Sequence, residues 1–172
     1  MPNMGHDVAR HNVQILKGNT QSGTPQPGCN CRGGPASCPV QGRCQTESVV
    51  YRATVNETTT GKTETYTRGT GNTFKERFYG HRSDTRHQGN RHNTCLADHI
   101  WCLKEQGKVF ETKWSLVERA SPFNPTTRKC GVCLKEKSHI LYNRTGASLN
   151  NRNDIFNTCR HRTQKLLVNV KS

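Results

Sequence analysis

The chain has few of the residues that build a large hydrophobic core. Leu, Ile, Val and Phe together supply 29 of its 172 residues, and hydrophobic residues of all kinds supply 30%. Acidic residues are also scarce, 12 against 26 Lys and Arg, so the formal net charge is +14. This composition is typical of disordered chains, but nine cysteines argue against disorder. Together these features predict a small domain whose weak core is supplemented by cross-links or metal.

Two further absences narrow the class of protein. No apolar run approaches the roughly 18 residues that span a bilayer, and the first residues lack the apolar segment and cleavage site of a secretory signal. We therefore expect a nuclear protein, or a cytoplasmic one before import, that is not secreted. In these reducing compartments clustered cysteines are typical metal ligands. A secreted, disulfide-bonded protein is the least favoured alternative, because nine cysteines cannot all pair.

Composition along the sequence divides the chain into four parts. They are a flexible polar linker over 1–28, a cysteine-rich segment over 29–47, the main domain over 48–162 and a basic tail over 163–172. The main domain contains all the segments with regular periodicity, so we expect it to hold the hydrophobic core.

Within the main domain, local patterns predict an α+β fold around a small sheet. β-branched and aromatic residues predict strands over 48–55, 63–69 and 109–120. Apolar spacing and capping residues predict helices over 74–81, 96–107, 133–142 and 151–161. The basic, polar stretch over 82–94 is expected to be a loop.

Eight of the chain's cysteines and histidines form two sets with the spacing of metal ligands. The first set, C-x-C-x6-C-x5-C, consists of Cys29, Cys31, Cys38 and Cys44. The second, C-x2-C followed later by C-x-H, consists of Cys130, Cys133, Cys159 and His161. Zinc takes four tetrahedral thiolate or imidazole ligands, so we predict two structural zinc ions. Exchange of ligands between the sets and simple burial of some cysteines remain alternatives. Cys95 and Cys102 are expected to pack in the core.

Another group of residues has the chemistry of phosphodiester hydrolysis. Tyr51 and Tyr66 lie in adjacent predicted strands, Arg77 and His81 share a helix face, and Glu136 lies in a later helix. Hydrolysis needs an activated nucleophile, positive charge at the phosphate and a metal ion on its oxygens. Each residue alone also has an ordinary structural explanation, as a packed ring or a solvated charge.

These residues and several short strings occur in an order that resembles the GIY-YIG endonucleases, most closely those of Penelope-like retroelements. The strings are VVY at 49–51, YTRGT at 66–70, GNTFKERFYGH at 71–81, HIWCLK at 99–104, CGVCLKEK at 130–137, LNNRN at 149–153 and CRHR at 159–162. The chain departs from the family in having Val49 and Val50 for glycine and isoleucine. It also has Arg68 where glycine is usual. An arginine at this position could add a contact to phosphate, or it could crowd Tyr66.

The resemblance implies a three-stranded antiparallel sheet flanked by helices and a metal-dependent cleavage of DNA. Carried onto this sequence, Tyr51 would activate the attacking water as general base and Tyr66 would help to position it. Arg77 would hold the scissile phosphate. His81 would assist proton transfer or contact the phosphate.

The resemblance also implies one catalytic Mg²⁺, or Mn²⁺, with Glu136 as its sole protein ligand. Asn150, or Asn151 beside it, would orient the leaving side. The expected activity is nicking or cleavage of duplex DNA, by the endonuclease module of a retroelement. The alternative is a zinc-stabilised nucleic-acid-binding protein that has lost catalysis.

The positive charge predicts a polyanionic partner, and double-stranded DNA fits better than a membrane because no basic amphipathic helix is evident. The basic residues expected at DNA are Arg82, Arg86, Arg128, Lys129, Arg152, Arg160 and Arg162. A reverse transcriptase or the element's RNA, in cis or in trans, is a further expected partner.

Overall fold

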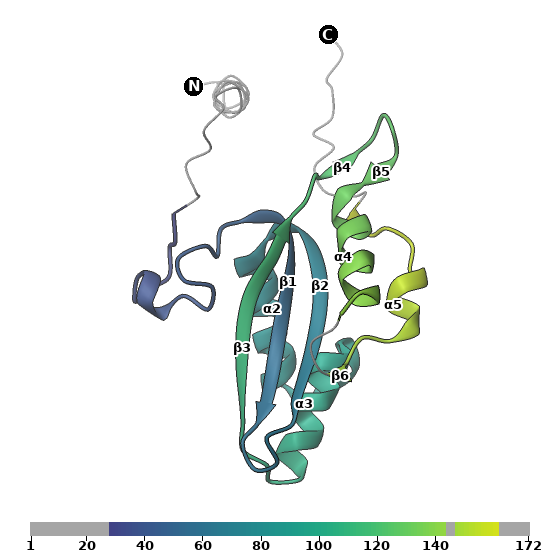
Figure 1. The fold of residues 1–172 in the computed structure, drawn as a ribbon. Coiled ribbons are helices and arrows are strands. Elements are labelled where there is room, and N and C mark those ends of the chain that lie inside the picture. Colours follow the sequence, from purple (N-terminus) through teal and green to yellow (C-terminus); the bar gives the residue numbers. More distant parts are fainter. Residues whose placement is uncertain (1–27, 144–146, 162–172) are drawn as a thin grey trace, which may run out of the picture.

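An antiparallel sheet of three long strands forms the centre of the protein (Figure 1). The computed structural model describes residues 28–143 and 147–161, apart from the side chains of residues 147 and 152. The strands β1 (Glu47–Glu57), β2 (Thr63–Thr73) and β3 (Phe110–Arg119) lie in the order β3-β1-β2. The expected α+β fold with a three-stranded antiparallel sheet is confirmed. A two-residue strand, β6 (Ala147–Ser148), adds a parallel edge beside β2 that the sequence did not predict.

Helices pack against both faces of the sheet (Figure 1). The helices α2 (Phe74–Arg86) and α3 (Cys95–Glu105) cover one face. On the other side, α4 (Gly131–Leu141) packs along β2, and the short α5 (Arg152–Phe156) lies beside α4. A small hairpin of β4 (Phe123–Asn124) and β5 (Lys129–Cys130) leads into α4.

The strand register places the two tyrosines on the same face. Ala53 pairs with Tyr66, and Tyr51 is two residues before Ala53, so all three side chains point toward α2 and α3. Phe74 begins α2, where the Thr73 hydroxyl accepts a hydrogen bond from the Glu76 amide, as the capping spacing predicts.

Aromatic rings fill the space between this face and α2. The Phe74 ring lies 5.4 Å from that of Tyr51, 5.9 Å from Trp114 and 6.0 Å from Phe78, measured between centroids. Phe74 itself is fully buried. A few aromatic side chains therefore supply the packing that the scarce aliphatic residues do not.

Three expectations about local structure are corrected. The expected loop over 82–94 is mostly helical, because α2 continues to Arg86 and a 3-10 helix spans Gln88–Asn93. Buried Asp84 supports this continuation by accepting a hydrogen bond from Asn93 (2.8 Å). The last helix ends at Phe156, well short of residue 161, because the chain then turns toward the cysteines of α4.

The core position expected for Cys95 and Cys102 is the third correction. Both are half-buried. Cys95 packs at the margin of the core and its sulfur accepts a hydrogen bond from Asn151 (3.0 Å), whereas the Cys102 sulfur accepts one from Arg91 (3.1 Å).

The ends of the chain lie largely outside the described residues. This applies to the expected linker, except for residue 28, and to the expected basic tail. Within the described part, no helix has both the length and the hydropathy to cross a bilayer.

Replacing Phe74 with Ala should reduce the free energy of unfolding by about 3–5 kcal/mol, because it empties the centre of the aromatic cluster. Phe156→Ala is the matched control, since this ring is 80% exposed and should change stability by less than about 0.5 kcal/mol. Denaturant unfolding of the two variants measures both values. Equal losses would contradict the assignment of Phe74 to the core.

Candidate functional site

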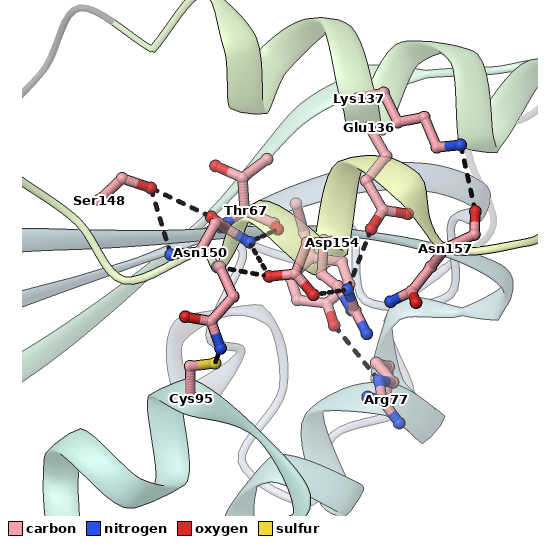
Figure 2. A network of polar contacts seen from close by, with 12 residues as sticks. Thr67, Arg77, Cys95, Glu136, Lys137, Ser148, Asn150, Asp154 and Asn157 are labelled. Carbon is pink, nitrogen blue, oxygen red and sulfur yellow. Dashed lines mark hydrogen bonds and ion pairs between the residues drawn. The ribbon is translucent and has the colours of Figure 1, made fainter.

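A polar cavity of about 260 Å³ opens at the edge of β2, where α2, α4 and α5 meet. Four cationic side chains and two carboxylates line it: Arg68, Arg77, Lys137, Arg160, Glu136 and Asp154. Glu136 from α4 and Asp154 from α5 point into the space above Arg77 (Figure 2). The excess of cations makes the cavity suitable for a phosphate group.

Gly69 on β2 determines how closely α4 approaches the strand. A Cβ atom at this position would lie 2.6 Å from Cγ1 of Val132 and 2.9 Å from Oε2 of Glu136. Both distances are shorter than normal contacts, so only glycine lets the helix lie this near. Glu136 is consequently held beside the strand with its side chain only 10% exposed.

Two opposing effects act on the Glu136 carboxyl group. Burial raises the pKa of Glu136, while the charge of Arg68 and a backbone hydrogen bond with Gly69 lower it. Burial is the larger effect, so the pKa of Glu136 is raised, and the carboxylate already faces the guanidinium of Arg68, which a bound cation would have to displace.

Arg68 points at the carboxylates of the cavity. Its Nη1 atom lies 2.7 Å from Oδ1 of Asp154 and 3.4 Å from Oε1 of Glu136. The Arg68 guanidinium therefore pairs with both carboxylates of the cavity.

Asp154 is a cavity residue that sequence reasoning missed. Its Oδ2 accepts a hydrogen bond from the Asn151 amide (2.9 Å) at the start of α5. The three-residue spacing from Asn151 to Asp154 is a capping signal that could have indicated it. Its ion pair with Arg68 had no such signal, because the two residues are 86 positions apart.

Beneath the cavity, Tyr51, His81 and Arg77 form a connected group. The Tyr51 hydroxyl oxygen lies 2.8 Å from Nε2 of His81 and accepts a hydrogen bond from Nε of Arg77 (3.3 Å). Burial lowers the pKa of His81 to about 3, so its ring is neutral. When the ring proton is on Nδ1, Nε2 accepts a hydrogen bond from the Tyr51 hydroxyl.

Both tyrosines are buried and neutral. Burial raises the pKa of Tyr51 well above its usual range and that of Tyr66 to about 12. The Tyr66 ring meets His81 edge-on at 5.8 Å between centroids. Neither tyrosine lines the cavity, so of this buried group Arg77 is the member that reaches it.

Asn150 lies outside the cavity lining and binds the edge of β2. Its side-chain amide donates to the Thr67 carbonyl (2.8 Å) and accepts from the Thr67 amide (2.9 Å), as Figure 2 shows. It also donates to Asp154 (3.3 Å). Asn150 therefore positions the strand and the carboxylate, while Asn151 begins α5.

Each predicted metal-binding set comes together in space. In the first, the Cys44 sulfur lies 3.8 Å from that of Cys31 and 3.7 Å from that of Cys29. Four sulfurs bound to one zinc at about 2.3 Å are separated by about 3.8 Å, whereas a disulfide requires about 2.0 Å. Burial raises the pKa of Cys38, but backbone hydrogen bonds with Val40 and Gly42 outweigh it and lower that pKa to about 7.

The second set closes around one histidine nitrogen. Nδ1 of His161 lies 3.1 Å from the sulfur of Cys133, 3.5 Å from that of Cys130 and 3.8 Å from that of Cys159. In both sets all four ligand atoms fall within 4.8 Å of one another. The predicted sets are thus the ones that the fold assembles, and both could hold zinc.

The second ligand set forms part of the cavity wall. Cys133 and His161 both line the cavity, and Glu136 follows Cys133 by one turn of α4. His161 also makes a hydrogen bond with the backbone of Gly69. The cluster therefore adjoins the strand and the helix that together hold Glu136.

The described basic residues expected at DNA lie on three separate parts of the fold. Arg82 and Arg86 are exposed on α2, Arg128 and Lys129 are exposed at the β4–β5 hairpin, and Arg160 is exposed and lines the cavity. The side chain of Arg152 and the whole of Arg162 lie outside the described residues.

No protein-family model, curated protein or solved structure matches the chain. The geometry of the cavity and of the two clusters is therefore the basis for a functional assignment.

Purified protein should contain about two zinc ions per chain. Cys44→Ser and Cys133→Ser should each remove one zinc, because each variant breaks a different cluster. Inductively coupled plasma mass spectrometry with a free-thiol titration measures both quantities. A parent protein that contains no zinc and has oxidised cysteines would contradict the clusters.

Gly69→Ala should destabilise the protein by about 1–3 kcal/mol, because the added methyl group collides with Val132 and Glu136. Gly80→Ala is the control: this glycine lies in α2 with open space around its Cβ position, and the change should stabilise by about 0.5–1 kcal/mol. Thermal or denaturant unfolding tests the pair. A neutral Gly69→Ala would contradict the close approach of α4.

Proposed function

We propose that the protein is a Mg²⁺-dependent DNA endonuclease of the GIY-YIG type, similar to the endonuclease modules of Penelope-like retroelements. The observation that carries the proposal is the position of Arg77. It donates a hydrogen bond to Tyr51 and lines the same cavity as Glu136. Tyr51 and Glu136 are 85 positions apart in the sequence and are expected to act together. The Arg77 side chain links them, because it contacts the first and shares the cavity with the second.

In this proposal the buried pair of Tyr51 and His81 moves a proton. Tyr51 would take a proton from the attacking water while its own proton passes to Nε2 of neutral His81, 2.8 Å away, which requires Arg77 to turn so that a water of the cavity reaches the buried tyrosine hydroxyl. A tyrosine with a raised pKa keeps its proton, so Tyr51 can act as a base only if His81 accepts that proton, and the lowered pKa of His81 opposes this transfer. Arg77 stabilises the negative charge that develops on the tyrosine oxygen and binds the phosphate.

The residues present fit a magnesium ion. Mg²⁺ prefers oxygen ligands and retains several waters, and Glu136 offers a largely buried carboxylate at a polar cavity. Bound there, the ion would supply Lewis-acid stabilisation of the phosphate oxygens. Asp154 adds a second negative charge beside Glu136, and the positive charge of Arg68 partly offsets the two carboxylates.

The charge of the protein supports duplex DNA as the substrate. With a net charge of +14 and four cations at the cavity, the chain is suited to a densely charged backbone. Arg128 and Lys129 on the β4–β5 hairpin lie close in sequence to the start of α4 and offer further phosphate contacts.

A zinc-stabilised nucleic-acid-binding protein without catalysis is the second candidate. The observation that favours it is the pairing of Arg68 with both Asp154 and Glu136. A guanidinium group held between these carboxylates competes with a metal ion for the same oxygens. Catalysis would then require Arg68 to turn toward the phosphate.

Glu136→Ala should abolish nicking of supercoiled plasmid in Mg²⁺ while leaving DNA binding within a few-fold, because it removes the metal ligand and little of the positive surface. Glu111→Ala is the control, since that carboxylate is 63% exposed on β3 and should leave nicking unchanged. Gel assays with Mg²⁺ added or omitted, rather than chelated, keep zinc in place. Equal nicking by the Glu136 variant and the parent would refute the metal site, and a parent that binds DNA but never nicks it would favour the second candidate.

A further inference from the structure

A second concave surface of about 640 Å³ lies between the cysteine-rich segment and α2. We call it the basic groove and define it by Arg32, Pro39, Lys75, Phe78, Tyr79 and Arg82. The start of α2 is fixed to the segment, since the Lys75 amide donates to the Cys44 carbonyl (2.8 Å) and its ammonium to the Asn30 carbonyl (3.0 Å). The groove is therefore a formed feature that depends on the position of the cysteine-rich segment against α2.

The groove faces away from the cavity. Tyr79 follows Arg77 by two positions, which is a rotation of about 200° around a helix. Lys75, Tyr79 and Arg82 share one stripe by their spacing of four and three, and Arg86 extends it. One side of α2 thus serves the proposed active site, and the other presents cations and a ring to solvent.

The lining of the groove has the chemistry of a nucleotide site. It contains three cations and no carboxylate. Tyr79 is 49% exposed, and the Lys75 ammonium lies 5.7 Å from the centroid of its ring. An acidic peptide would use the cations alone, whereas a nucleotide uses both the cations and the flat ring.

We propose that the basic groove binds one nucleotide of a single nucleic-acid strand, with its base stacked on Tyr79 and its phosphate paired with Arg82. In a duplex the bases stack on one another, so an unpaired strand is the ligand that uses the ring. This site is separate from the proposed cleavage of DNA and does not depend on it.

The test compares affinities for a short labelled single strand and for the duplex of the same sequence, by fluorescence anisotropy without Mg²⁺. All proteins are full-length chains with Glu136→Ala, so that none can cut. Tyr79→Ala should weaken single-strand binding by about 5- to 100-fold, and Tyr79→Phe should stay within about twofold because the ring remains. Arg82→Gln should reduce the slope of log K against log salt by about 0.7.

Tyr142→Ala is the matched control, since this tyrosine is 75% exposed at the end of α4, far along the chain from the groove. It should leave single-strand affinity unchanged. The proposal is overturned if Tyr79→Ala has no effect, if it weakens duplex and single-strand binding equally, or if Tyr142→Ala causes the same loss. Unchanged zinc content in Tyr79→Ala shows that the groove is intact. Nicking by the parent protein is measured separately, so failure of the proposed endonuclease leaves this result standing.

Discussion

The contact between Gly69 and α4 is the constraint on which the site depends. The strand and the helix approach so closely that a single methyl group would not fit, and this places Glu136 beside β2. The same strand carries Arg68 and, two residues earlier, Tyr66. Because α4 also carries Cys130 at its N-cap and Cys133 in its first turn, one helix contributes both to the cavity and to a set of residues that could hold zinc.

The two clusters lie on opposite sides of the proposed active site. Cys38 and Cys44 pack in the same core cluster as Tyr51 and Phe74, whereas Cys133 and His161 line the cavity with Glu136. Structural zinc binds finger peptides with about 10–16 kcal/mol, comparable to the whole net stability of a typical domain. A chain with so few aliphatic residues can therefore keep the charged groups of the cavity in fixed positions, provided that both ligand sets bind zinc and the metal stabilises the fold.

Features encoded locally could be predicted, and features that depend on distant parts of the chain could not. β-branched residues predicted the strands, Thr73 and Glu76 predicted the start of α2, and short spacings identified both ligand sets. The partnership of Arg68 with Asp154 arises only when α5 reaches β2. Asn150 likewise binds a strand edge whose free groups exist only in the folded sheet. The helix α5 ends early because the chain after it must bring Cys159 and His161 to the cysteines of α4. No local sequence pattern predicts this contact.

The separation in sequence between the two halves of the cavity has a consequence for how the protein is made. The tyrosine and histidine side is encoded by residues 51–81, but Arg68 meets its carboxylate partners only 68 and 86 residues later. During synthesis the first cysteine set and the β1–β2 hairpin are complete before α4 and α5 leave the ribosome. A nascent or truncated chain that ends before residue 136 would hold Arg68 without either of its carboxylate partners, so the charge balance of the cavity is completed only after α4 and α5 have been synthesised.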